Sequence, residues 1–92
     1  MSFKIELTQR VLDDIEKFEK AGNYRLLRKI QTLFQELKEH PTTGTGKPEL
    51  LKHYEQPTWS RRISRQHRLI YTIEDMTVTV IVLSAWGHYD DK

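Results

Sequence analysis

The order in which hydrophobic periodicity changes along the chain constrains the fold more than any other feature of the sequence. An alternating stretch at residues 3–7 precedes two stretches with helical spacing, and three strand-like stretches follow these. This order, β-α-α-β-β-β, lacks the regular alternation of strands and helices that builds a parallel α/β sheet. We therefore predict an α+β fold in which a helical hairpin packs on one face of an antiparallel sheet.

Capping residues define the two predicted helices. Thr8 can cap the first helix, and Ala21-Gly22 ends it because glycine accepts the left-handed conformation at a helix C-terminus. Asn23 can cap the second helix, which ends before Pro41. Because the link between the helices is so short, we expect them to run antiparallel.

Three strands are predicted in the second half of the chain, at residues 59–63, 67–73 and 77–85. A tight turn at Asp75-Met76 would join the last two strands and fix their register. The resulting apolar face consists of three cross-strand pairs, namely Ile73 with Val78, Tyr71 with Val80, and Leu69 with Val82.

Length and composition favour a single intracellular domain. The chain of 92 residues contains no cysteine, which excludes disulfides and thiolate metal sites. Its longest apolar run, residues 78–83 with Thr79 allowed, is too short to cross a bilayer, and the N-terminus has no signal-peptide core. We expect residues 1–92 to form one domain in the cytoplasm.

Positive charge is concentrated in the middle of the chain. Residues 1–43 hold eight Lys and Arg against seven acidic residues, whereas residues 44–68 hold six against two. With Leu69 directed toward the core, Arg68 faces the opposite side of the sheet, and Arg62 joins it if Trp59 and Ile63 point inward. Paired guanidinium groups on a sheet face suit a phosphate-bearing ligand, so a polyanion is the expected partner. The alternative is that Arg61, Arg62 and Arg65 are solvated charges that protect the strands from edge pairing.

The reactive side chains suit the cleavage of RNA without a metal ion. Such cleavage uses the 2′-hydroxyl of the substrate as nucleophile and needs a base, an acid and cations for the phosphorane charge. Glu49 follows a proline, Arg68 lies on a strand, and His88 changes charge near neutral pH, with Tyr89 beside it. The four histidines lack metal-ligand spacing, so we expect neither a metal ion nor another cofactor.

Three segments together resemble a known family. The motifs "GKPELLKH" (46–53), "WSRRISRQHRLIY" (59–71) and "GHY" (87–89) resemble the Txe/YoeB family of toxin endoribonucleases, in the RelE-like superfamily of toxin–antitoxin systems. The resemblance covers nearly the whole chain. It implies an mRNA interferase that acts in the A site of the 70S ribosome and is neutralised by a Phd/YefM-type antitoxin. Homodimers occur in that family.

The resemblance also implies roles for individual residues. It identifies Glu49 as the general base, Arg68 as the group that stabilises the scissile phosphate, and His88, paired with Tyr89, as the general acid. The residues expected to contact RNA are Lys47, Lys52, His53, Arg62 and Arg65.

Two features of the C-terminus qualify these roles. The chain continues beyond Tyr89 with Asp90-Asp91-Lys92, and two carboxylates near His88 would favour its protonated form but repel phosphate. The predicted register would also direct His88 away from Arg68, so a bulge or break near Trp86-Gly87 is needed. The alternative function is a protein that binds RNA, the ribosome or another target through the same basic face, without catalysis.

Overall fold

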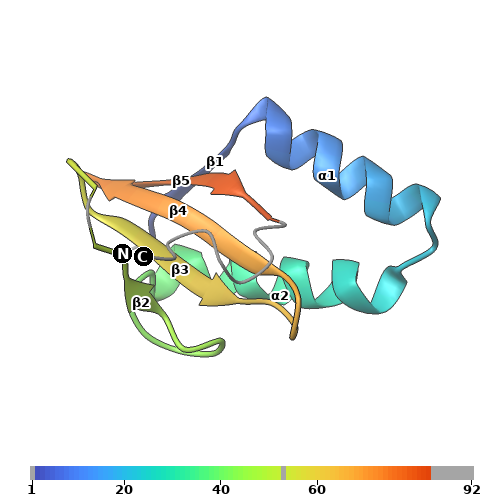
Figure 1. The fold of residues 1–92 in the computed structure, drawn as a ribbon. Coiled ribbons are helices and arrows are strands. Elements are labelled where there is room, and N and C mark those ends of the chain that lie inside the picture. The colour runs from blue at the N-terminus through green and yellow to red at the C-terminus, as the bar shows by residue number, and fades with distance from the viewer. Residues whose placement is uncertain (1, 53, 84–92) are drawn as a thin grey trace.

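A helical hairpin lies against one face of a five-stranded sheet in the computed structural model, which describes residues 2–52 and 54–83 (Figure 1). The predicted α+β architecture is therefore confirmed. The elements in chain order are β1 (Lys4–Leu7), α1 (Gln9–Lys20), α2 (Tyr24–Glu39), β2 (Glu49–Leu50), β3 (Thr58–Arg62), β4 (Arg68–Glu74) and β5 (Thr77–Val82). The strand order across the sheet is β1-β5-β4-β3-β2.

Both predicted helix caps are confirmed. The Thr8 side chain accepts a hydrogen bond from the Val11 N–H, and the Asn23 side chain accepts one from the Leu26 N–H, at 3.3 and 3.4 Å. Gly22, with φ of 71°, ends α1 in the left-handed conformation. Within the described ranges, no helix is long and apolar enough to cross a membrane.

The hydrophobic core lies between α2 and the sheet. Alternate residues of β4 and β5 face the helices and are buried, as the predicted apolar face requires. Trp59 packs at the edge of this core, as its alternation on β3 predicts. The buried core residues are Val11, Leu26, Ile30, Leu33, Leu37, Ile63, Leu69, Tyr71, Val78, Val80 and Leu83.

The sheet is mixed rather than wholly antiparallel, because β1 pairs with β5 in parallel. The prediction of an antiparallel sheet is correct for the strands that follow one another along the chain, β2 to β5. Tight connections impose opposite directions on neighbouring strands, but no turn joins β1 to β5. Pairing places Ile5 beside Val78 and Leu7 beside Val80, so that the apolar rows of the two strands match.

A bulge in β5 changes the predicted register. Ile73 pairs with Val78 and Tyr71 with Val80, as expected, but Val82 pairs with Ile70 instead of Leu69. Ile81 is the extra residue, and its carbonyl accepts a hydrogen bond from the Thr8 hydroxyl at 3.1 Å. After the bulge the faces of β5 are exchanged: Leu83 joins the core, and Val82 lies on the opposite face of the sheet with Ile70.

Strand ends differ from the prediction by one residue at β3 and β4. β5 ends at Val82, whereas the predicted strand continued to Ala85, and residues 84 and 85 lie outside the described ranges. The two-residue strand β2 was not among the strands predicted from the sequence. Its pairing with β3 brings residue 49 into the sheet, which matters for the site described next.

Candidate functional site

The pairing of three strands places Glu49, Arg62 and Arg68 on one face of the sheet. Glu49 is paired with Ser60 across β2 and β3, and Arg62 is paired with Arg68 across β3 and β4. Directly opposed residues of antiparallel strands share a face, and so do residues two apart on one strand. The side chains of these three residues, and that of Ser60, therefore project from the face of the sheet opposite the helices.

The distance between strands leaves room for a substrate group. Because β3 separates β2 from β4 and neighbouring strands lie about 4.8 Å apart, Glu49 and Arg68 are on strands about 10 Å apart. A phosphodiester can lie over β3 between the two side chains. Arg68 is also displaced by two residues along the strands, because it pairs with Arg62 while Glu49 pairs with Ser60.

Arg68 is held in place by a neighbouring side chain. Its Nη1 donates a hydrogen bond to the Ser60 hydroxyl at 3.4 Å, and Ser60 is buried. Arg68 itself is half-buried, whereas Arg62 beside it is exposed. Two guanidinium groups directly opposite each other repel, and an anion bound between them removes that repulsion.

Glu49 is exposed on its short strand, but the backbone on either side of it is fixed to β3. The Gly46 carbonyl accepts a hydrogen bond from the Arg62 N–H at 2.7 Å, and the Leu51 N–H donates to the Thr58 carbonyl at 2.8 Å. Gly46 has φ of 86°, and a Cβ there would lie 2.6 Å from the Arg62 carbonyl oxygen. This close approach to β3 therefore requires glycine.

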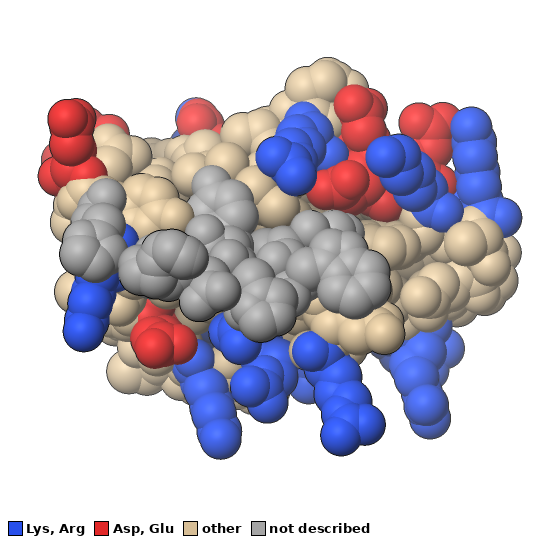
Figure 2. Space-filling model, viewed as in Figure 1, with Lys and Arg blue, Asp and Glu red and all other residues tan. Residues whose placement is uncertain are grey.

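The remaining predicted residues fall into two groups. Lys47, Lys52 and Arg65 are exposed in the segments before and after β2 and after β3. Basic side chains line the lower edge of the molecule in Figure 2, while most of the visible acidic side chains lie along the upper edge and the left. The residues that lie outside the described ranges are His53, His88 and Tyr89.

His67 has a structural environment. Its ring contacts the Phe18 ring edge-on at 5.4 Å between centroids, and its Nδ1 lies 3.1 Å from the Ser64 hydroxyl. These contacts close the turn between β3 and β4 and join it to α1. They agree with a structural role for His67.

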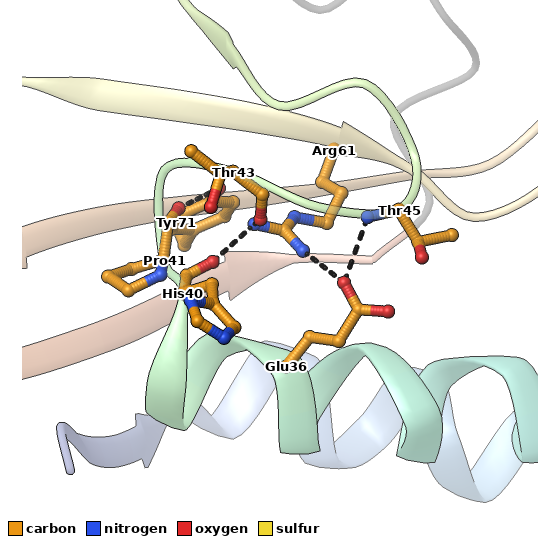
Figure 3. A network of polar contacts seen from close by, with 7 residues as sticks. All are labelled: Glu36, His40, Pro41, Thr43, Thr45, Arg61 and Tyr71. Atoms are coloured by element: carbon orange, nitrogen blue, oxygen red, sulfur yellow. Dashed lines mark hydrogen bonds and ion pairs between the residues drawn. The ribbon is translucent and has the colours of Figure 1, made fainter.

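Arg61 is the functional candidate that the sequence interpretation missed, since a solvated edge charge was the alternative considered for it. Its side chain is 0% exposed and lies between β3 and the C-terminal part of α2 (Figure 3). The sequence did contain a signal for this burial. Arg61 has the same parity on the strand as Trp59 and Ile63, which were expected to face inward. The idea that this arginine protects the sheet edge is therefore wrong.

Two shifted pKa values belong to the surroundings of Arg61. Hydrogen bonds from Thr45, aided by the nearby Arg61 charge, lower the pKa of Glu36 below its ordinary value. Burial raises the pKa of Tyr71, whose hydroxyl donates to the Pro41 carbonyl at 2.6 Å. Both groups thus keep their ordinary charge at neutral pH, Glu36 ionised and Tyr71 neutral.

Comparison with known proteins identifies relatives over most of the chain. Residues 7–89 match the family model described as the YoeB-like toxin of bacterial type II toxin–antitoxin systems. The chain is 37% identical to Toxin YoeB of Synechocystis sp. over 86 residues, which are 94% of this chain and 96% of that protein. The structure is similar to the YoeB/ParE toxin from Agrobacterium tumefaciens, with a TM-score of 0.81 and 34% identity over 88% of this chain and 95% of that one. It is also similar to a chain of the YoeB–YefM complex from Staphylococcus aureus, with a TM-score of 0.78 and 29% identity over 89% of this chain and 94% of that one.

Proposed function

The chain belongs to the YoeB-like toxin family of bacterial type II toxin–antitoxin systems, and we propose that it is a ribosome-dependent endoribonuclease that cleaves messenger RNA. The observation that carries this proposal is the strand pairing that directs Glu49, Arg62 and Arg68 to one face. A carboxylate on the same face of a sheet as two guanidinium groups suits phosphoryl transfer.

The proposed reaction needs no metal ion. Glu49 accepts the proton of the 2′-hydroxyl, whose oxygen then forms a bond to the adjacent phosphorus. Arg68, assisted by Arg62, stabilises the charge on the phosphorane oxygens. The bond from phosphorus to the 5′-oxygen breaks, and His88 donates a proton to that oxygen. The products are a 2′,3′-cyclic phosphate and a 5′-hydroxyl.

The bulge in β5 changes the register from which the direction of His88 was predicted, and His88 itself lies outside the described residues. Without the bulge, even-numbered residues of the last strand would continue to face the core, away from Arg68. After Ile81 the parity is reversed, so that Val82 shares the face of Arg68. From the sequence, we assign the role of proton donor to His88. Tyr89, the next residue, would stack on a base or donate a hydrogen bond.

The proposed partners follow from family and charge. YefM is the partner named for the Staphylococcus aureus relative, so we propose a Phd/YefM-type antitoxin here. Its acidic segment would cover the basic face and exchange carboxylates for RNA phosphates. The proposed target is message bound in the ribosomal A site, which places the protein in the cytoplasm, and Lys47, Lys52, His53 and Arg65 are proposed to contact RNA.

A cleavage assay with message, purified ribosomes and purified chain tests the function, with the product ends identified. We expect Glu49→Ala and His88→Ala to abolish cleavage while the folded structure and antitoxin binding persist. Glu74→Ala is a matched control, because Glu74 is also exposed on a strand but lies six residues, roughly 20 Å, along β4 from Arg68.

Parent-level cleavage by both variants would overturn the assigned roles. A separate result would support the non-catalytic alternative, in which the basic face only binds. In that case, growth arrest caused by expression without antitoxin would survive the simultaneous loss of Glu49, Arg68 and His88.

A further inference from the structure

A buried network of charged groups, Arg61 on β3 and Glu36 on α2, binds the segment that leads from α2 to Glu49. The Arg61 guanidinium is 0% exposed, and its Nη1 lies 3.0 Å from Oε1 of Glu36 on α2. A buried guanidinium is costly unless it is paired and hydrogen-bonded. Its partners therefore indicate what the charge is used for.

Arg61 binds backbone as well as a carboxylate. Its Nη2 donates to the His40 carbonyl at 2.9 Å and to the Thr43 carbonyl at 2.8 Å (Figure 3). These carbonyls belong to the segment that leaves α2 and leads to β2. A planar guanidinium can bind three acceptors at once in a fixed geometry, which an ammonium group cannot do.

Glu36 extends the same network farther along the segment. Its Oε1 also accepts a hydrogen bond from the Thr45 N–H at 2.9 Å. Gly44, with φ of 111°, passes so close that a Cβ there would lie 2.6 Å from Oε1 of Glu36. The Gly46 carbonyl is bound by the Arg62 N–H, so the backbone from residue 40 to residue 46 is fixed at four places.

Glu49 lies three residues beyond the last of these contacts, and Pro48 restrains the backbone just before it. Arg61 and Arg62 are consecutive residues of β3. The strand therefore binds this segment through Arg61 on the helix side and carries the Arg62 guanidinium on its opposite face. The position of the carboxylate relative to Arg62 and Arg68 is thereby tied to the network around Arg61.

We propose that Arg61 is a positioning residue that, together with Glu36, fixes the segment of residues 40–48 and so sets the place of Glu49 relative to Arg68. The catalytic consequence rests on the proposed function, whereas the fixing of the segment does not. Buried ion pairs add little stability compared with well-packed apolar residues of the same size. A specific backbone conformation is the better explanation for keeping a charge here.

The first experiment measures the segment without reference to activity. Glu36→Met removes the acceptor with little change in volume, and Glu36→Gln keeps an amide oxygen but removes the charge. We expect amide hydrogen exchange at Thr45 and Arg62 to accelerate at least tenfold in Glu36→Met and less in Glu36→Gln. Exchange at Tyr71 and at Val80 should accelerate less than exchange at Thr45 and Arg62.

Glu16→Met is the control for this experiment, because it removes the exposed ion pair between Glu16 and Lys20, 3.5 Å apart, far from the segment. Parent-like protection of Thr45 and Arg62 in Glu36→Met would overturn the proposal. Equal acceleration at Tyr71 and Val80 would also overturn it, because the network would then serve only the stability of the whole fold.

The second experiment tests the link to Glu49 in the ribosome assay. A displacement of the base by about 1 Å can cost about 10²-fold in rate. We expect Glu36→Met to lower kcat by roughly 10- to 100-fold with KM within about twofold of the parent. Arg61→Lys, which keeps the charge but loses the planar fork, should fall between parent and Glu36→Met.

A double-mutant cycle separates positioning from stability. If the network acts through Glu49, Glu36→Met should have no further effect on the residual rate of Glu49→Ala. If the double variant instead loses rate by the product of the two single losses, the proposed link between the network and Glu49 is overturned. If the parent chain cleaves no message, the proposed function fails, while hydrogen exchange still decides whether Arg61 and Glu36 fix the segment.

Discussion

Arg61 and Arg62 are consecutive residues of β3 with opposite surroundings. Arg61 faces the helices, and its two Nη atoms bind Glu36 and two backbone carbonyls, while its buried Nε has no hydrogen-bond partner among the described residues. Arg62 is exposed on the other face, opposite Arg68. Among the ion pairs of residues 2–52 and 54–83, neither Arg62 nor Arg68 has a carboxylate partner.

The comparison shows how the same side chain serves two purposes. A guanidinium that donates to several acceptors of the protein organises the backbone around it. Guanidinium groups that face each other without a carboxylate are ready for an anion from outside the chain. The chemistry of the side chain does not distinguish Arg61 from Arg62, but the face of β3 on which each lies does.

The largest expected effect is on the outer face, where Arg68→Ala should lower the rate of message cleavage by roughly 10²- to 10³-fold. The phosphorane charge would lose its fixed cation, while the hydrogen bond lost within the described part of the chain is the 3.4 Å contact with Ser60. The measurement is single-turnover cleavage on ribosomes, with Arg10→Ala on α1 as control. Cleavage at the parent rate would show that Arg68 does not contact the reacting phosphate.

A smaller effect, on stability, is expected on the inner face. Arg61→Met should lower the free energy of unfolding by about 3 kcal/mol, because the Glu36 carboxylate and two carbonyls lose a buried donor. Arg62→Met is the matched control, and its free energy of unfolding should stay within about 0.5 kcal/mol of the parent value. Denaturant unfolding measures both. Equal losses in the two variants would remove the distinction between the faces.

The third effect concerns RNA affinity. In a Glu49→Ala background, which prevents cleavage, Arg62→Met should weaken the binding of a single-stranded RNA several-fold. The slope of log affinity against log salt should become shallower by about 0.7, the value for one lost phosphate contact. A fluorescence titration at several salt concentrations gives both numbers. An unchanged slope would support the alternative given in the sequence analysis, in which Arg62 is a solvated charge that contacts no phosphate.

The smallest effect is on pH dependence. Because hydrogen bonds and the Arg61 charge lower the folded pKa of Glu36 below its ordinary value of 4.5, its ionised form is favoured by folding. That contribution to stability is complete above the unfolded pKa and is lost as the pH falls through the folded pKa. The free energy of unfolding should therefore decrease more between pH 5 and pH 3 in the parent than in Glu36→Gln. Parallel curves would contradict this.

Local signals in the sequence predicted the helices and most of the sheet. Thr8 and Asn23 mark both helix starts because their side chains cap the first turn, which depends only on residues close in sequence. The two-residue turn at Asp75-Met76 fixed the pairing of Ile73 with Val78 and Tyr71 with Val80. The bulge at Ile81 was not predictable in this way, because its carbonyl is bound by Thr8, a residue far away in sequence.

The arrangement of the candidate site was predicted only in part: Arg62 and Arg68 were expected on one face of the sheet, as their pairing confirms, but the place of Glu49 was not predicted. The motifs around Glu49 and Arg68 identified both side chains, whereas strand pairing through β3 is what brings them to one face. The same pairing exposed the error about Arg61, whose role depends on Glu36 and on the end of α2. Contacts between segments so distant along the chain leave no local pattern.

The sequence by itself determined which segments are helical or extended, where the helices begin and end, and which side chains can act on a phosphate. These properties follow from side-chain shape, capping and charge, which act over a few residues. Only the tertiary structure decided that β1 lies parallel to β5, that Arg61 is buried, and that Glu49 shares a face of the sheet with Arg68. Those outcomes depend on which distant surfaces pack together, and packing is chosen by the free energy of the whole fold.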